Sequence, residues 1–184
     1  MTRAAVVALL GLLPACLAPL AWGGPEAGLG LAGGPVYHRY RLPQDVGADL
    51  VFTSAGLSLS GDAQFVFDDR WSVNPALQFS YEPTTNMFEG SGNTEGRVFA
   101  YAALFQVRCW LGNAYAALHL GVYQEVFRSR SGQVFERGHE GGGGAVGWEQ
   151  PGGLTLALLG DVESPLPGAD RIFALRFNVG YRWD

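Results

Sequence analysis

The sequence contains no lysine, and this and other shortages narrow the class of protein. All twelve basic residues are arginines, and the formal net charge of −5 gives no general argument for nucleic-acid binding. Only two cysteines are present, Cys16 and Cys109. Because Cys16 lies in an expected leader, the exported chain would keep one thiol and could form no internal disulfide. After residue 24 no apolar run is long enough for a membrane helix.

The N-terminal stretch predicts a secretory signal peptide over residues 1–23. It begins with a basic residue, Arg3, continues with an apolar stretch and ends in small residues. Cleavage is expected after Gly23, with Ala21 as the alternative. A transmembrane anchor is the rival interpretation of this segment, and two prolines, Pro14 and Pro19, disfavour it. The exported part, 24–184, has the length of a single domain.

Apolar residues alternate with small or polar ones through the rest of the chain. The clearest case is the last segment, where every second residue is apolar or aromatic: Phe173, Leu175, Phe177, Val179, Tyr181 and Trp183. A β-strand places alternate side chains on opposite faces, so this segment has one apolar face. We therefore expect no helix and eight strands, over roughly 27–40, 50–67, 71–82, 96–111, 113–127, 140–149, 153–163 and 171–183.

The connections between these segments alternate in length. Those at 68–70, 111–113 and 149–152 are tight, whereas the other four, at 41–49, 83–95, 128–139 and 164–170, are longer and polar. An even number of strands with short turns on one rim is typical of transmembrane barrels. The pattern predicts an all-β fold, a closed up-and-down eight-stranded antiparallel transmembrane β-barrel. Its polar face is rich in small residues, which suit a crowded interior.

Tryptophan placement supports the same orientation. Four tryptophans lie at or near strand ends on the short-turn rim, where they would form an interfacial aromatic girdle: Trp71, Trp110, Trp148 and Trp183. Trp110 falls on the wrong face for this role unless a bulge intervenes. Near the opposite rim lie Tyr37, Tyr81, Phe99, Tyr101 and Phe173. A soluble lipocalin-like binding barrel, with its apolar face inward, remains the alternative.

The stretch Arg176–Trp183, RFNVGYRW, resembles the C-terminal strand of bacterial outer-membrane proteins. Tyr181 and Trp183 match its aromatic positions, although the family usually ends on the aromatic and here Asp184 follows. Together with strand number, loop pattern and leader, the whole exported chain resembles small porin-like barrels, the OmpA-type barrel domain and OmpX-like proteins. The resemblance implies a monomer in the outer membrane of a Gram-negative bacterium, inserted by the barrel-assembly machinery and surrounded by lipid and lipopolysaccharide.

Charged residues also occur on the inward face of the expected strands. Charges inside a narrow barrel must pair or be hydrated. We expect a salt-bridge network that largely occludes the lumen, formed by Arg176, Asp62, His119, Arg108, Asp161, Glu163 and Arg182. The alternative is that these charges gate a small pore.

Several arginines cluster at or beyond the long-loop rim. In an outer membrane this rim meets the phosphates of lipopolysaccharide, and guanidinium groups suit phosphate oxygens. Arg128, Arg130 and Arg137 are therefore predicted to contact lipid phosphate. The alternative is that loops are simply polar in a chain that uses arginine in place of lysine.

An outer-membrane lipid A hydrolase or acyltransferase is the alternative function. His139 lies near Ser129 and Ser131, and His38 lies in the first strand. The sequence lacks the His-x-Ser pair of the deacylases and the N-terminal amphipathic helix of the palmitoyltransferases, so catalysis is not expected. Three scattered histidines predict no metal site, and no cofactor is expected. The run Gly141–Gly144 indicates close backbone packing rather than a phosphate loop.

Overall fold

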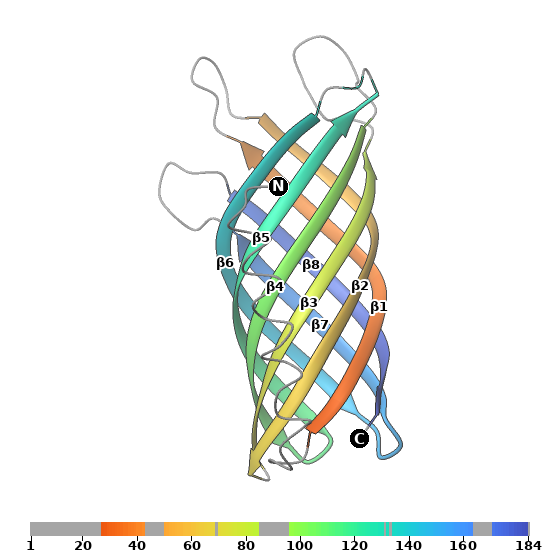
Figure 1. Ribbon diagram of the computed structural model, residues 1–184, viewed down its shortest axis with the longest axis vertical. Coiled ribbons are helices and arrows are strands. Elements are labelled where there is room, and N and C mark those ends of the chain that lie inside the picture. The colour runs from red at the N-terminus through yellow and green to blue at the C-terminus, as the bar shows by residue number, and fades with distance from the viewer. Residues whose placement is uncertain are drawn as a thin grey trace.

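The computed structural model is a closed barrel of eight antiparallel strands that follow one another in sequence order (Figure 1). It describes residues 27–42, 50–68, 70–84, 96–130, 132, 134–163 and 171–183. The fold class expected from the sequence is confirmed, whereas the expected signal peptide lies outside the described residues. The strands are β1 (Ala27–Leu42), β2 (Leu50–Asp68), β3 (Trp71–Thr84), β4 (Gly96–Leu111), β5 (Ala114–Ser129), β6 (Val134–Glu149), β7 (Leu154–Glu163) and β8 (Arg171–Trp183).

The strand register fixes the shape of the barrel. The paired residues can be followed from Arg182 on β8 through each strand in turn, and the path returns to β8 at Ile172, ten residues away. A stagger of this size in eight strands requires the strands to tilt by about 40°. Because β1 pairs with β8, the backbone groups along all strands find partners and no sheet edge is left open.

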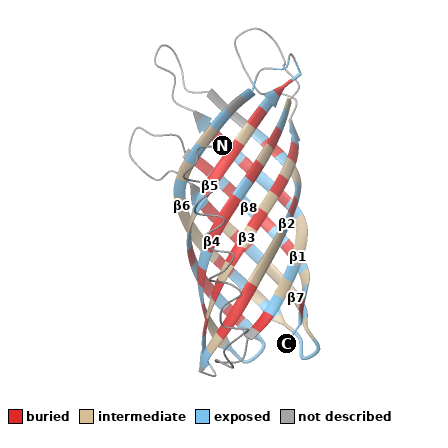
Figure 2. Ribbon diagram, viewed as in Figure 1, coloured by how far each residue is buried: buried red, intermediate tan, exposed pale blue. Residues whose placement is uncertain are grey.

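Burial alternates along the strands (Figure 2). Most of the large apolar side chains lie on the exposed, outer face. On β8, Phe173, Leu175 and Phe177 are exposed on the outer wall, whereas Ala174 and Arg176 between them are buried. A water-soluble barrel would bury the aromatic residues and expose the arginine. The lipocalin-like alternative, with its apolar face inward, is therefore wrong.

Two aromatic levels on the outer wall mark the height of a membrane. On β3, Trp71 and Tyr81 are ten residues apart, and on β8 so are Trp183 and Phe173. Ten residues at about 3.3 Å each, along strands tilted by about 40°, span roughly 25 Å, the height of the apolar band of a transmembrane barrel. Trp148 is also exposed, at the level of the short turns.

The one large boundary difference concerns β6, which was expected to begin at residue 140 but begins at Val134. The ladder to β5 continues upward beyond the expected start, pairing His139 with Tyr123 and Val134 with Arg128. The polar loop expected over 128–139 is therefore mostly strand. Among the described residues, no helix is long and apolar enough to cross a membrane.

Two outward leucines with equal exposure test whether the wall faces lipid. Leu118 lies between the two aromatic levels and Leu111 beside a tight turn, and both side chains are 74% exposed. Leu118→Arg is expected to lower the free energy of unfolding in lipid vesicles by about 2–4 kcal/mol, and Leu111→Arg by about 0–1 kcal/mol, because the cost of a buried charge falls toward the interface. Equal effects in urea titrations would contradict a lipid-facing wall.

Candidate functional site

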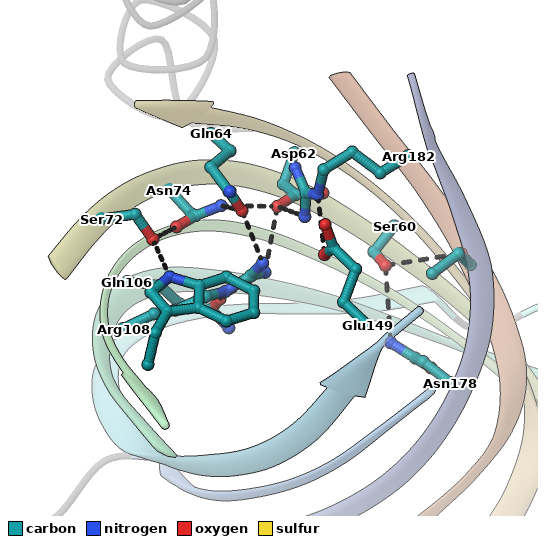
Figure 3. A network of polar contacts seen from close by, with 12 residues as sticks. Ser60, Asp62, Gln64, Ser72, Asn74, Gln106, Arg108, Glu149, Asn178 and Arg182 are labelled. Carbon is teal, nitrogen blue, oxygen red and sulfur yellow. Dashed lines mark hydrogen bonds and ion pairs between the residues drawn. The ribbon is translucent and has the colours of Figure 1, made fainter. Parts of the chain in front are cut away.

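In the short-turn half of the lumen, two arginines and two carboxylates form a connected network around Asp62 (Figure 3). Arg108 from β4 and Arg182 from β8 each place an Nη2 atom 3.0 Å from the same Asp62 oxygen. Arg182 also donates from Nε to Glu149 of β6, at 3.0 Å. Four strands are thus joined by charge-assisted hydrogen bonds, with two positive and two negative groups in balance.

Amide side chains from neighbouring strands complete this network. Asn74 donates to Asp62 at 2.9 Å, and Arg108 donates to Gln106 at 3.0 Å and to Gln64 at 3.3 Å. The Arg108 guanidinium thus donates from Nε, Nη1 and Nη2, and the Oδ2 atom of Asp62 accepts from Asn74, Arg108 and Arg182. Such saturation is what allows charged groups to lie in a narrow interior without a large desolvation penalty.

Trp110 belongs to this network and not to the interfacial girdle predicted from the sequence. Its indole nitrogen donates to the buried Ser72 hydroxyl at 3.0 Å, and its ring lies 5.0 Å from that of Tyr115. The register of β4 with β5 continues through Trp110 without a bulge and pairs it with the buried Tyr115, so Trp110 keeps its inward direction. Arg108 also stacks on Tyr115, with its guanidinium carbon 4.6 Å from the centre of the Tyr115 ring.

Nearer the long-loop end, a second group of charges lies deeper in the barrel. Arg176 of β8 forms an ion pair with Asp161 of β7, and Asp161 also contacts His119 of β5. All three side chains are buried. The Tyr123 hydroxyl lies 3.5 Å from Asp161. This cluster joins β5, β7 and β8, beside the seam where β8 meets β1.

His38 connects Arg176 to Glu82. Its Nδ1 lies 2.7 Å from Glu82, and its Nε2 lies 3.2 Å from Arg176 Nη2. A guanidinium can only donate, so this contact requires Nε2 to accept and places the ring proton on Nδ1, facing the carboxylate. Glu82 also accepts hydrogen bonds from Ser54 and from Ser80, the latter at 2.8 Å.

The structure brings six of the seven predicted lumen residues into these two groups. Asp62, Arg108 and Arg182 meet in the group near the short turns, which we call the lower charges. Arg176, Asp161 and His119 meet in the group nearer the long loops, which we call the upper charges. Their inward direction was predicted from strand parity, but their partners were not. The seventh, Glu163, ends β7, and its side chain lies outside the described residues. The predicted network did not include His38, which was considered only for catalysis, or Gln64, Asn74 and Gln106. All four share the inward parity that could have identified them.

Glycines on the inward face make room for these charged groups. A Cβ atom on Gly143 would collide with the Gly160 carbonyl and lie 2.9 Å from His119 Nε2 and from the Asp161 Cα. A Cβ on Gly30 would likewise collide with the Asp62 carboxylate. The glycine run of β6 thus provides the space in which His119 and Asp161 pair, which is the close packing that the sequence indicated.

Arginines also line the outer wall at the long-loop rim. Arg97 on β4 lies directly opposite Arg128 on β5, and both are exposed. Arg130 is exposed just beyond the end of β5. Arg137, grouped with them from the sequence, has the inward parity of β6 and pairs in register with Glu125, a buried residue. The register therefore separates Arg137 from the outer arginines and adds Arg97 to them.

Four aromatic rings lie on the wall just below Arg97 and Arg128. Phe99 follows Arg97 by two residues on the same face of the tilted strand β4, about 5 Å closer to the membrane centre. The Tyr81 and Phe99 ring centres are 5.2 Å apart, and those of Phe79 and Tyr101 are 5.3 Å apart. We call these four rings the aromatic quartet.

The histidines considered for catalysis lie inside the barrel. His38 is fully buried, and His139 stacks on Tyr123 with ring centres 5.7 Å apart. Ser129 is buried, and Ser131 lies outside the described residues. Glu82 accepts a hydrogen bond from Ser54 and contacts His38, and His38 and Ser54 lie opposite each other in the register of β1 and β2. All three side chains are buried.

In comparisons with known proteins, no family model matches the chain and no curated protein matches its sequence. Solved structures do match. Ail of Yersinia pestis, in complex with the heparin analogue sucrose octasulfate, has a TM-score of 0.54 at 19% identity, covering 86% of this chain and 99% of Ail. The outer membrane protein OprG of Pseudomonas aeruginosa has a TM-score of 0.54 at 13% identity, covering 87% and 97%. The neisserial surface protein NspA has a TM-score of 0.52 at 11% identity, covering 85% and 97%.

Structural similarity at sequence identities this low shows a shared fold and does not show a shared function. The chain is a small eight-stranded barrel of the outer-membrane type. Its apolar wall, its two aromatic levels and its polar interior agree with that fold.

Neighbouring glycines of β6 test the space needed by the upper charges. Gly143→Ala places a methyl group against His119 and Asp161, whereas Gly144→Ala meets nothing closer than 3.4 Å. We expect Gly143→Ala to lower the free energy of unfolding by about 1–3 kcal/mol through overpacking. Gly144→Ala should stay within about 0.5 kcal/mol of the parent. Tryptophan fluorescence during urea unfolding in vesicles measures both, and an equal response would contradict the packing argument.

Proposed function

We propose that this chain is a structural outer-membrane barrel that binds the phosphates of lipopolysaccharide on its outer rim, with a lumen closed to solutes. The observation that carries the proposal is the placement of Arg97 and Arg128 side by side on the outer wall, directly above the aromatic quartet. Like charges directly opposite each other on a sheet are unfavourable unless an anion lies between them. A lipid phosphate at headgroup depth supplies that anion.

The surroundings of the arginine pair suit a lipid better than a soluble anion. Aromatic rings favour the membrane interface, so the quartet places the guanidinium groups at the level of the headgroups. Among the described residues of this part of the rim, one carboxylate, Glu136, lies on the outer face of β6 diagonally from Arg128, so the arginines outnumber the carboxylates there. Arg39 lies elsewhere on the rim, with the exposed Tyr37 two residues closer to the membrane centre on the same face of β1, which repeats the order of arginine above aromatic ring. The lipid thus meets charge at its phosphate and apolar surface at its acyl chains.

The interior supports closure of the lumen. Tyr40, Val98, Phe127 and Ile172 form an apolar cluster inside the barrel toward the long-loop end, each at most 3% exposed. Below them lie the upper charges, and below those the network around Asp62. A solute would have to displace paired charges at two levels, and separating a buried ion pair costs several kcal/mol.

Lipopolysaccharide binding is tested with the double variant Arg97→Gln, Arg128→Gln. Charge-assisted hydrogen bonds contribute roughly 1.5–3 kcal/mol each, so the affinity for lipopolysaccharide is expected to fall by tenfold or more. The measurement is lipid A retained by the detergent-purified barrel, together with binding to lipopolysaccharide-containing vesicles. Arg137→Gln, on the inward face, and Arg70→Gln, exposed on the short-turn rim, serve as matched controls. Equal retention by all four proteins would overturn the proposal.

Closure of the lumen is tested in planar bilayers. The folded protein is expected to show no steady ionic conductance. Arg176→Ala leaves Asp161 buried without its cation, so we expect it to lower the free energy of unfolding by about 3–5 kcal/mol, measured by urea titration in vesicles. A steady current through the parent protein, or an Arg176→Ala variant that conducts with unchanged stability, would show a gated pore instead.

A further inference from the structure

The seam between β1 and β8, where the barrel closes, has one interruption in its pairing. The pairing stops after Gly33 and resumes at Val36. Gly34 and Pro35, which lie between, pair with β2 but not with β8. Proline has no N–H group, so Pro35 cannot donate the backbone hydrogen bond that this register directs to Phe177. One backbone hydrogen bond of the seam is therefore missing.

A second interruption lies between β2 and β3. The pairing is interrupted between Asp62 and Phe65 of β2, and the register places Pro75 of β3 opposite Ala63. A proline thus again removes an N–H donor from the ladder. The pairing of β1 with β2 is continuous. The β1–β2 hairpin is therefore intact, but each of its two outer edges has an interruption beside a proline.

Both interruptions lie at a depth where bulk water cannot replace the missing bonds. Phe177 and Pro75 are each four residues from one aromatic level of their strand and six residues from the other. Both positions therefore lie within the apolar band of the wall. Because lipid tails offer no hydrogen bonds, other contacts between the strands have to come from side chains inside the barrel.

At the seam, an asparagine side chain spans the interruption. The register places Asn178 of β8 opposite Gly34, which has no side chain, so Asn178 reaches across β1 to β2. There it accepts a hydrogen bond from Ser58 at 3.3 Å and donates one to Ser60 at 3.4 Å (Figure 3). Ser58 also donates to the Gly34 carbonyl at 3.1 Å. β8 is thus tied to the hairpin directly beside Pro35.

The second interruption has the same arrangement. Asn74 of β3 directly precedes Pro75 and lies opposite Gln64 of β2 in the register. Its amide donates to Gln64 at 3.3 Å and to Asp62 at 2.9 Å (Figure 3). A side-chain amide offers the same kinds of donor and acceptor as a peptide group. At each edge where a proline interrupts the ladder, an asparagine therefore connects the hairpin to its neighbour.

We propose that Asn178 and Asn74 are side-chain latches that hold the β1–β2 hairpin in the wall beside Pro35 and Pro75, and that the wall opens locally where a latch is released. This goes beyond the proposed closure of the lumen, which concerns the interior and not the wall. The closing seam then depends on side chains at one point where a backbone bond would otherwise serve.

Amide hydrogen exchange, followed by NMR in detergent micelles, tests the latch at the seam. The probe is the amide of Phe177. The reference is the amide of Leu120, on β5, where pairing is continuous on both sides. Asn178→Ala is expected to speed exchange at Phe177 by about three- to tenfold, as the loss of one or two neutral hydrogen bonds implies, and to leave Leu120 unchanged. An equal rise at both amides, or no rise at Phe177, would overturn the proposal.

Restoring the missing backbone bond gives a second test. Pro35 is exposed on the outer wall, so Pro35→Val keeps the surface apolar and supplies an N–H group to the seam. In this background, Asn178→Ala should change exchange at Phe177 by less than about twofold, because the backbone bond replaces the latch. Pro75→Val, at the other edge of the hairpin, is the matched control and should leave the effect of Asn178→Ala intact. The shift in gel mobility on boiling shows that each variant is folded. The same effect of Asn178→Ala with and without Pro35 would contradict the latch.

Discussion

The outer wall of the barrel faces lipid, so the polar and charged side chains of the membrane-crossing part lie inside a tube of eight strands. No backbone group can turn to water at that depth, so the ladder must close on itself, as it does where β1 meets β8. With a stagger of ten residues, the strands tilt enough for the interior to be only just wide enough for side chains. Each inward residue therefore has to fit the residues opposite it in volume and in hydrogen bonding.

Inward glycines on one strand provide the space that inward charged side chains on the neighbouring strand occupy. Gly30 lies opposite Asp62, and Gly143 lies opposite Asp161, so the absence of a side chain on one strand makes room for a carboxylate on the next. The carboxylates in turn attract arginines from more distant strands, Arg182 in the first case and Arg176 in the second. Each of these two glycines thus makes room for one carboxylate and, through it, for one inward arginine.

Strand parity explains how much of this could be predicted. Alternation predicted the closed barrel, its orientation and the inward direction of six charged residues, because one face of every strand meets lipid. It did not predict which charges meet, since Arg108 reaches Asp62 across 46 positions of the sequence through a register that no local pattern encodes. The same lack of information about strand register explains why Arg137 was wrongly grouped with the outer arginines. Its polar neighbours suggested a loop, and only the ladder between β5 and β6 shows that it faces inward, opposite Glu125.

Trp110 shows why a residue type alone is a weak guide to position. Its place at the end of a strand suited an interfacial girdle, as for Trp71 and Trp183, but its parity points inward. An indole needs a hydrogen-bond acceptor wherever it is partly buried, and Ser72 supplies one within the barrel mouth. The ring then packs against Tyr115, which also lies under the guanidinium of Arg108. The tryptophan therefore packs beside the charged network. The outer wall keeps its aromatic level there through Trp71, Trp148 and Trp183, so the barrel uses one residue type in two physically different settings, on the outer wall at the interface and inside the lumen beside the charges.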